Sequence, residues 1–220
     1  MNILLPGILE KEQSNISQKI TAVSSFSKEI HIDLIDGKFA QNSTFADPEF
    51  FKQFTKDIFF ELHMMVDNPV QYLKPWADAG FKRFIGHIEK MPDIDEFIAQ
   101  TQLVGEVGLA IDAKTPLDNL KINFDDIDNI LIMTVNAGQS GQQFMPECLE
   151  KVKKLREQTL IPLTVDGGIN EETLVNSAKA GANRFITTSA LFESKDPKKT
   201  YENLIKLAEA NLQLPPVTSL

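Results

Sequence analysis

Short apolar runs alternate with stretches of helical periodicity along almost the whole chain. The apolar runs are rich in β-branched residues and many end in turn-forming residues, which is typical of buried strands. We therefore expect strands over 3–5, 29–37 with its closing Asp36-Gly37 turn, 59–66, 81–88, 107–111, 130–135, 160–165 and 184–188. Between them we expect helices over 11–26, from Asp47-Pro48 onward, and over 68–80, 94–102, 115–120, 145–158, 171–180 and 198–211.

The order of these elements predicts the fold class. Strands that alternate with helices at this spacing form parallel sheets, because each helix carries the chain back to the start of the next strand. Eight such units in 220 residues fit a closed, single-domain (β/α)8 TIM barrel, and a doubly wound open sheet is the alternative. We expect residues 1–211 to form the catalytic barrel domain. Residues 212–220, which include two consecutive prolines, should form a loosely held C-terminal tail.

Composition narrows the classes of partner. The net charge of −9 argues against a basic surface for nucleic acid or anionic membranes, although a local anion site remains compatible with it. The first residues lack the pattern of a signal peptide, and no apolar run is long enough to span a bilayer. The single cysteine, Cys148, cannot form an internal disulfide, which fits a reducing compartment. We expect a cytoplasmic protein with no nucleic acid or membrane partner.

Four side chains that suit a metal ion lie near the ends of three predicted strands. His31 and Asp33 are two residues apart and share one face of their strand, His63 lies on the next strand, and Asp166 ends the seventh. Active sites of (β/α)8 barrels lie at the C-terminal ends of the strands, so these side chains should converge. Two imidazoles and two carboxylates suit Zn²⁺, Fe²⁺, Mn²⁺ or Co²⁺. Each residue alone could equally be a turn former or a satisfied polar group, but the joint pattern favours a site.

Three later segments have the composition of an anion-binding site. Residues 136–143 contain two glycines, Gly167-Gly168 follows the seventh strand, and 187–189 follows the eighth. Glycine lets backbone N–H groups approach a ligand closely, and the helix that follows Gly168 adds a partial positive charge. The loops after the seventh and eighth strands are the usual phosphate site of this barrel. Taken singly these glycines are better explained by plain turns, but their occurrence together at the ends of the seventh and eighth strands favours phosphate.

Several motifs, in order, resemble the ribulose-phosphate 3-epimerase family over about 4–207. The segments that carry the resemblance are His31-Ile-Asp-Leu-Ile-Asp-Gly-Lys-Phe39, Leu62-His-Met-Met-Val66, Met133-Thr-Val-Asn-Ala-Gly138, Gly141-Gln-Gln-Phe144 and Val165-Asp-Gly-Gly-Ile-Asn170. The resemblance implies a (β/α)8 barrel that converts D-ribulose 5-phosphate to D-xylulose 5-phosphate in the pentose phosphate pathway. Barrels of this family often self-associate, so a homo-oligomer is expected.

The same resemblance implies roles for single residues. It assigns His31, Asp33, His63 and Asp166 as ligands of one divalent metal ion, and Asp33 and Asp166 also as the acid/base pair. The ion would polarise the C2 carbonyl and the C3 hydroxyl and stabilise an enediolate, while one aspartate removes the C3 proton and the other returns one on the opposite face. The expected substrate-binding residues are Met65, Met133, Gly138, Gly141, Gly167, Gly168, Thr188 and Ser189.

The chain also departs from the family pattern around the substrate. Gly7 stands where a serine is usual, Ile35 replaces a methionine, and Thr188 replaces a glycine. These changes leave open two alternatives, a C3 epimerase of another ketose phosphate such as allulose 6-phosphate, and an inactive barrel that binds a sugar phosphate. The two methionines, Met65 and Met133, could equally be core residues. His87, on the fourth strand, could support a metal ligand from behind, but a satisfied structural histidine is the more common explanation, and we do not include it among the site residues.

Overall fold

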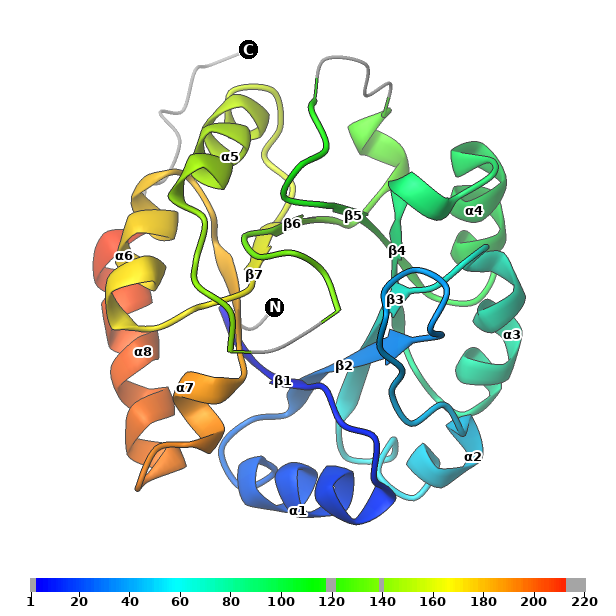
Figure 1. Ribbon diagram of the computed structural model, residues 1–220, viewed down its shortest axis with the longest axis horizontal. Helices are drawn as coiled ribbons and strands as arrows, with labels where there is room; N and C mark the ends of the chain where they lie inside the picture. The colour runs from blue at the N-terminus through cyan, green and yellow to red at the C-terminus, as the bar shows by residue number, and fades with distance from the viewer. Residues whose placement is uncertain (1–2, 118–121, 139–140, 213–220) are drawn as a thin grey trace.

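The computed structural model describes residues 3–117, 122–138 and 141–212. Its centre is a closed barrel in which each parallel strand pairs with the next and the last pairs with the first (Figure 1). The predicted (β/α)8 barrel is therefore confirmed. The strands are β1 (Leu4–Ile8), β2 (Glu29–Ile35), β3 (Phe59–Met65), β4 (Arg83–His87), β5 (Glu106–Ile111), β6 (Asn129–Met133), β7 (Leu163–Asp166) and β8 (Arg184–Thr187).

Helices surround the barrel (Figure 1). They are α1 (Gln13–Val23), α2 (Pro48–Phe51), α3 (Val70–Asp78), α4 (Ile94–Gln102), α5 (Leu149–Arg156), α6 (Glu171–Lys179), α7 (Ser189–Phe192) and α8 (Pro197–Asn211), with 3-10 turns η1 (Ile88–Lys90), η2 (Phe124–Asp126) and η3 (Pro146–Cys148). Within the described part of the chain, none of the helices is long and apolar enough to cross a membrane. The tail expected over 212–220 lies outside the described residues, apart from Leu212.

Some element boundaries differ from the sequence-based expectation. The first strand continues through Pro6 and Gly7 to Ile8, because Pro6 lies opposite Thr187 of β8 and Gly7 lies opposite His31 of β2. The helix expected over 115–120 is not formed over 115–117, and its remaining residues lie outside the described residues. The short helix α7 was not expected, because its four residues are too few to show helical periodicity.

Alternation along the strands separates an apolar layer from a polar barrel interior. On β2, Ile30, Ile32 and Leu34 belong to the hydrophobic core between the strands and the helices. Below α2 and α3 this layer contains an aromatic cluster with ring centroids 4.8–6.0 Å apart, formed by Phe51, Phe60, Trp76 and Phe81. The intervening residues of β2 point into the barrel, where they meet side chains of distant strands.

Charged side chains fill the N-terminal half of the barrel interior. Arg184 of β8 bonds to Glu29 of β2 at 3.0 Å and to Glu61 of β3 at 2.7 Å. Arg83 of β4 bonds to Glu29 at 2.7 Å and to Glu61 at 2.6 Å. β8 and β3 are not neighbours in the sheet, so the Arg184–Glu61 contact crosses the barrel. Buried charges are tolerated only when they are paired and hydrogen-bonded, and each of these groups is. This charged layer supports the site above it.

Candidate functional site

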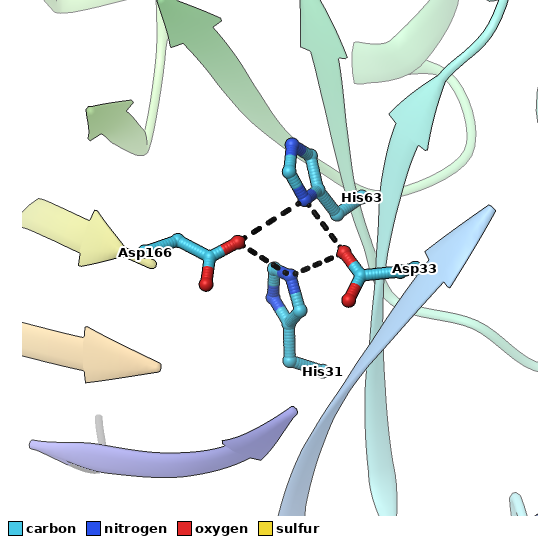
Figure 2. A group of neighbouring side chains, drawn as sticks. All are labelled: His31, Asp33, His63 and Asp166. Carbon is cyan, nitrogen blue, oxygen red and sulfur yellow. Dashed lines mark hydrogen bonds and ion pairs between the residues drawn. The ribbon is translucent and has the colours of Figure 1, made fainter. Parts of the chain in front are cut away.

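The four residues with metal-binding side chains meet at the C-terminal end of the barrel (Figure 2). His31 and Asp33 come from β2, His63 from β3, and Asp166 is the last residue of β7. The register pairs Asp33 with His63 across β2 and β3, which sets both side chains at the same height. One ligand atom from each residue lies within 4.8 Å of all the others, and all four residues are buried. The structure thus brings together the four residues that the strand pattern placed on facing surfaces.

The spacing of the four ligand atoms fits one small cation. Oδ1 of Asp33 lies 2.8 Å from Nδ1 of His63 and 3.3 Å from Nε2 of His31. Oδ2 of Asp166 lies 3.5 Å and 3.8 Å from the same two nitrogens. Four ligands at tetrahedral positions around a zinc-sized ion would be about 3.4 Å apart. Nε2 of His31 is buried, and apart from its contacts with the carboxylates of Asp33 and Asp166 it has no polar partner among the described residues. The residues present therefore fit a divalent metal.

Glu61 orients His31, a role that our sequence analysis did not assign to it. Oε1 of Glu61 lies 2.6 Å from Nδ1 of His31, and its other oxygen accepts hydrogen bonds from Arg83 and Arg184. A carboxylate on the far nitrogen of a histidine fixes the ring and directs the near nitrogen to a metal. Glu61 was visible from the sequence only as a residue on the same strand face as His63. Its hydrogen bond with Arg184 forms only because the barrel closes, and closure cannot be predicted from a short stretch of sequence.

The electrostatic environment separates the two aspartates. Burial, together with the negative charge of Asp33, raises the pKa of Asp166 to about 6. Burial acts on Asp33 in the same direction, but hydrogen bonds to His31 and His63 overcome it and hold the Asp33 pKa below its usual range. At mildly acidic pH one carboxyl therefore holds a proton and the other is ionised. Such a pair is the arrangement needed to remove a proton and deliver one.

His31 has an unusual protonation state when no cation is bound. Burial would lower its pKa, but hydrogen bonds to Asp33 and Glu61 raise the pKa to about 10. A metal ion binds neutral imidazole, so it must displace this proton from Nε2. The proton and the cation therefore compete for the same atom.

A cavity opens over the cluster, and every expected substrate-binding residue lines it. These residues are Met65, Met133, Gly138, Gly141, Gly167, Gly168, Thr188 and Ser189. Asp33 and Asp166 line the same cavity, which places the two carboxyls and the glycine loops around one space. Gly141, Gly168 and Ser189 also line an adjoining hollow that extends toward α6. Residues 139 and 140 of the glycine-containing loop lie outside the described residues.

The start of α6, where we expected a helix N-terminus to assist an anion, is capped by a side chain of the chain itself. The side chain of Asn170 accepts hydrogen bonds from the backbone N–H groups of Glu172 and Thr173, in a capping box at the start of α6. Those two N–H groups are therefore not available to a phosphate. The turn before α6 needs glycine at both positions, because Gly167 has φ 114° and a Cβ on Gly168 would lie 3.1 Å from the backbone of Phe144. At the start of α6, an anion would therefore have to bind other backbone groups than the N–H groups of Glu172 and Thr173.

His87 lies closer to the site than the sequence indicated. Its Nε2 is 2.9 Å from Nε2 of His63, and its Nδ1 is 3.1 Å from Glu89. Burial would raise the pKa of Glu89, but hydrogen bonds from His87, Thr115 and the backbone N–H of Asp112 hold it at about 2. His87 is thus a buried, hydrogen-bonded histidine behind His63, which is compatible with both explanations given from the sequence. The register that pairs His63 with Ile85 brings His87 to the same face, and register could not be obtained from the sequence.

Comparisons with known proteins agree with these observations. The model of the family described as "Ribulose-phosphate 3 epimerase family" matches residues 3–192. The ribulose-phosphate 3-epimerase of Schizosaccharomyces pombe is 32% identical over 209 residues, covering 91% of both chains. The cytoplasmic isoform of ribulose-phosphate 3-epimerase from Oryza sativa is 31% identical and covers 94% of this chain and 95% of its own length. A crystal structure of KGPDC from Streptococcus mutans matches with TM-score 0.74, 15% identity and coverage of 96% of this chain and 98% of that one. Because the sequence identity with this structure is only 15%, the similarity shows that the two proteins share a fold and nothing more.

Proposed function

The chain belongs to the ribulose-phosphate 3-epimerase family, and from this premise we propose that it converts D-ribulose 5-phosphate to D-xylulose 5-phosphate by two-aspartate proton transfer at C3. It is an isomerase of the carbohydrate epimerase type. The observation that carries the proposal is the placement of Asp33 and Asp166. The two carboxyls come from separate strands, face each other over His31 and His63, and line one cavity (Figure 2).

Inversion at C3 requires a proton to leave one face of the sugar and another to arrive on the opposite face. Beside a C2 carbonyl, loss of the C3 proton leaves a planar enediolate, which can be protonated from either side. In one direction, Asp33 takes the C3 proton and Asp166 donates its own, and in the reverse direction the roles exchange. In the metal-free cluster the pKa of Asp166 is raised and that of Asp33 is lowered, which supports a difference in role between the two carboxyls. Each positioned acid or base typically contributes about 10²–10⁴-fold to the rate.

His31, Asp33, His63 and Asp166 would hold one divalent ion, with Zn²⁺, Fe²⁺, Mn²⁺ and Co²⁺ as the candidates. When bound, such an ion supplies Lewis-acid stabilisation of negative charge on the substrate oxygens. The chain's own contribution is orientation: Glu61 fixes the ring of His31 so that Nε2 faces the other ligands. Since Asp33 and Asp166 would also be ligands, a bound ion would restrict the movement of both carboxyls.

The remaining lining residues would bind and enclose the substrate. Met65 and Met133 are buried and would form a polarisable wall that excludes water from the reacting carbon. Gly138, Gly141, Gly167, Gly168 and Ser189 would hold the phosphate through backbone groups, and Thr188 would contact the sugar. We also propose a cytoplasmic location, which the name of the rice relative supports. Self-association stays a prediction.

An exchange assay tests the function directly. The protein, with its metal content measured, is incubated in D₂O with D-ribulose 5-phosphate, and with allulose 6-phosphate in parallel, and the C3 proton signal is followed by NMR. We expect loss of the C3 proton and appearance of D-xylulose 5-phosphate, faster than any reaction of the six-carbon substrate. Faster turnover of allulose 6-phosphate would move the assignment to that sugar. If the metal-loaded protein exchanges the C3 proton of neither substrate, the proposed activity is refuted and the remaining alternative is an inactive barrel that binds a sugar phosphate.

A further inference from the structure

The two histidines of the cluster present opposite nitrogens to it. His31 directs Nε2 toward the aspartates and gives Nδ1 to Glu61. His63 directs Nδ1 toward Asp33 and Asp166, which leaves its Nε2 on the far side of the ring (Figure 2). That far nitrogen meets another histidine instead of a carboxylate, 2.9 Å away at Nε2 of His87. The proposed mechanism assigns no role to this contact between His63 and His87.

The contact between His63 and His87 has the geometry of a hydrogen bond. The ring centroids are 5.0 Å apart and the rings are 25° from parallel, whereas the two nitrogens are only 2.9 Å apart. The nitrogens therefore lie between the centroids, and the rings meet edge to edge rather than face to face. Both histidines are buried, and Phe39 packs against the His87 ring with centroids 4.6 Å apart. The pair is held in place from several sides.

The positions of the ring protons determine which of the two histidines is the donor in this hydrogen bond. Two ring nitrogens at this distance need one proton between them, because neutral imidazole has one donor and one acceptor nitrogen. If Nδ1 of His63 offers its lone pair to a cation, its proton must be on Nε2, which donates to Nε2 of His87. The proton of His87 is then on Nδ1 and faces Oε2 of Glu89 at 3.1 Å. Oε1 of Glu89 accepts from the backbone N–H of Asp112 at 2.8 Å, so every group from Nε2 of His63 to Glu89 is satisfied.

The opposite order of protons does not satisfy the same groups. If His63 carried its proton on Nδ1, it would donate to Asp33 and its Nε2 would accept from His87. Neutral His87 would then present a lone pair on Nδ1 to the carboxylate of Glu89, so that two acceptors would face each other at 3.1 Å. From His63 outward to Glu89, only the first order pairs every donor with an acceptor. At its inner end this order leaves a lone pair on Nδ1 of His63, 2.8 Å from Oδ1 of Asp33, and a cation bound between them would satisfy both atoms.

We propose that His87 and Glu89 are positioning residues that fix His63 in the Nε2–H tautomer and so prepare its Nδ1 to bind a divalent cation. Each of the two metal-binding histidines is then oriented by a carboxylate. Glu61 acts on His31 directly, whereas Glu89 acts on His63 through the ring of His87. Outer residues of this kind typically change metal affinity by about 10–100-fold when they are replaced. The inference rests on the proposed function only in requiring that the site bind a divalent cation.

The first test measures zinc affinity by competition with a chelator, without any turnover. His87→Phe keeps an aromatic ring but removes the acceptor, and we expect it to weaken zinc binding by about 10–100-fold. Glu89→Gln keeps an oxygen that can accept from His87, so it should lose less affinity than Glu89→Met, which keeps the length but has no such oxygen. Glu150→Gln is the matched control, since Glu150 pairs with Lys153 on the exposed side of α5 and does not touch the chain of histidines. Unchanged zinc affinity in both His87→Phe and Glu89→Met would overturn the proposal.

The second test reads the tautomer in the wild-type protein, so it does not depend on how the variants fold. Ring ¹⁵N shifts of the zinc-loaded protein should show His63 protonated on Nε2 and His87 protonated on Nδ1. A proton on Nδ1 of His63, or a wild-type protein that binds no zinc, would overturn the proposal. These readouts are separate from catalysis: a protein that binds zinc with this tautomer but exchanges no C3 proton would refute the proposed function and leave this inference standing.

Discussion

The hydroxyl oxygen of Thr188 lies 2.6 Å from the point that a Cβ atom on Gly7 would occupy. The two residues lie at the C-terminal ends of β1 and β8, where Pro6 pairs with Thr187. Real Cβ atoms do not approach another heavy atom so closely, so a side chain at position 7 and Thr188 in this rotamer exclude each other. Two departures from the family pattern that are far apart in the sequence, Gly7 and Thr188, are therefore in direct steric contact.

Gly7→Ser should destabilise the protein, because its Cβ meets both Thr188 and Cγ2 of Ile186 at 2.6 Å. Overpacking of this kind costs about 1–3 kcal/mol. The double variant Gly7→Ser/Thr188→Gly should recover part of that loss, since the contact with Ile186 remains. Urea unfolding of the two single variants and the double variant gives the coupling energy between the positions. If the two substitutions change the free energy of unfolding additively, residues 7 and 188 do not interact in the way proposed.

Thr188→Val should impair catalysis without affecting the fold. Valine keeps the shape of the side chain but removes the hydroxyl, and in the described chain this hydroxyl makes no capping hydrogen bond to α7. Loss of one hydrogen bond to a bound sugar costs about 0.5–1.5 kcal/mol. We expect kcat/KM for D-ribulose 5-phosphate to fall by about 2–13-fold while Tm stays unchanged. Thr188→Ser, which retains the hydroxyl, is the matched control and should keep most of the activity.

Asp33→Asn and Asp166→Asn should each abolish exchange of the C3 proton. Asparagine has nearly the same shape but cannot accept or deliver the proton, so the rate should fall by at least about 10²–10⁴-fold. The assay is C3 exchange in D₂O, with circular dichroism to show that the barrel persists. Metal content must be measured in parallel, because both residues are also proposed ligands. Near-normal exchange in either variant, with its fold and metal intact, would rule out the two-base scheme.

Glu61→Gln should destabilise the metal-free protein to an extent that depends on pH. Burial would raise the pKa of Glu61, but Arg184, His31 and Arg83 overcome that effect and hold the pKa below its usual 4.5. A depressed pKa stabilises the fold above about pH 4.5, and this contribution is lost as the pH falls toward the folded pKa. Removing one partner of a buried ion pair costs about 3–5 kcal/mol, so Glu61→Gln should lose about this much at its maximum.

The partner of Glu61 sets the upper side of this pH window. The pKa of His31 is raised from 6.5 to about 10, so its contribution is complete below pH 6.5 and is lost as the pH rises through about 10. The difference between wild type and Glu61→Gln should therefore be largest between about pH 4.5 and 6.5. Urea unfolding in the presence of a chelator, across this range, measures it. A difference that does not vary with pH would show that the Glu61 carboxylate is not what stabilises this layer.

Local periodicity was sufficient to predict those features that belong to short segments. The alternation of His31, Asp33 and Ile35 along one strand, and the Asp166-Gly-Gly turn, predicted that the cluster would gather at one end of the barrel, where the structure has it. Features that depend on register or barrel closure were missed. The contact of His87 with His63 requires the pairing of β3 with β4, and the Arg184–Glu61 bond joins residues 123 positions apart.

The charged layer of the barrel interior has a consequence for how the chain can be divided. Glu29 and Glu61 come from the first half of the barrel, and one of their two guanidinium partners, Arg184, comes from its last strand. A fragment that ended after β4 would leave two carboxylates facing a single arginine, and the complementary fragment would bury Arg184 without either of them. Half-barrels cut from this protein should therefore be poorly folded alone, and the closed barrel should melt as one cooperative unit.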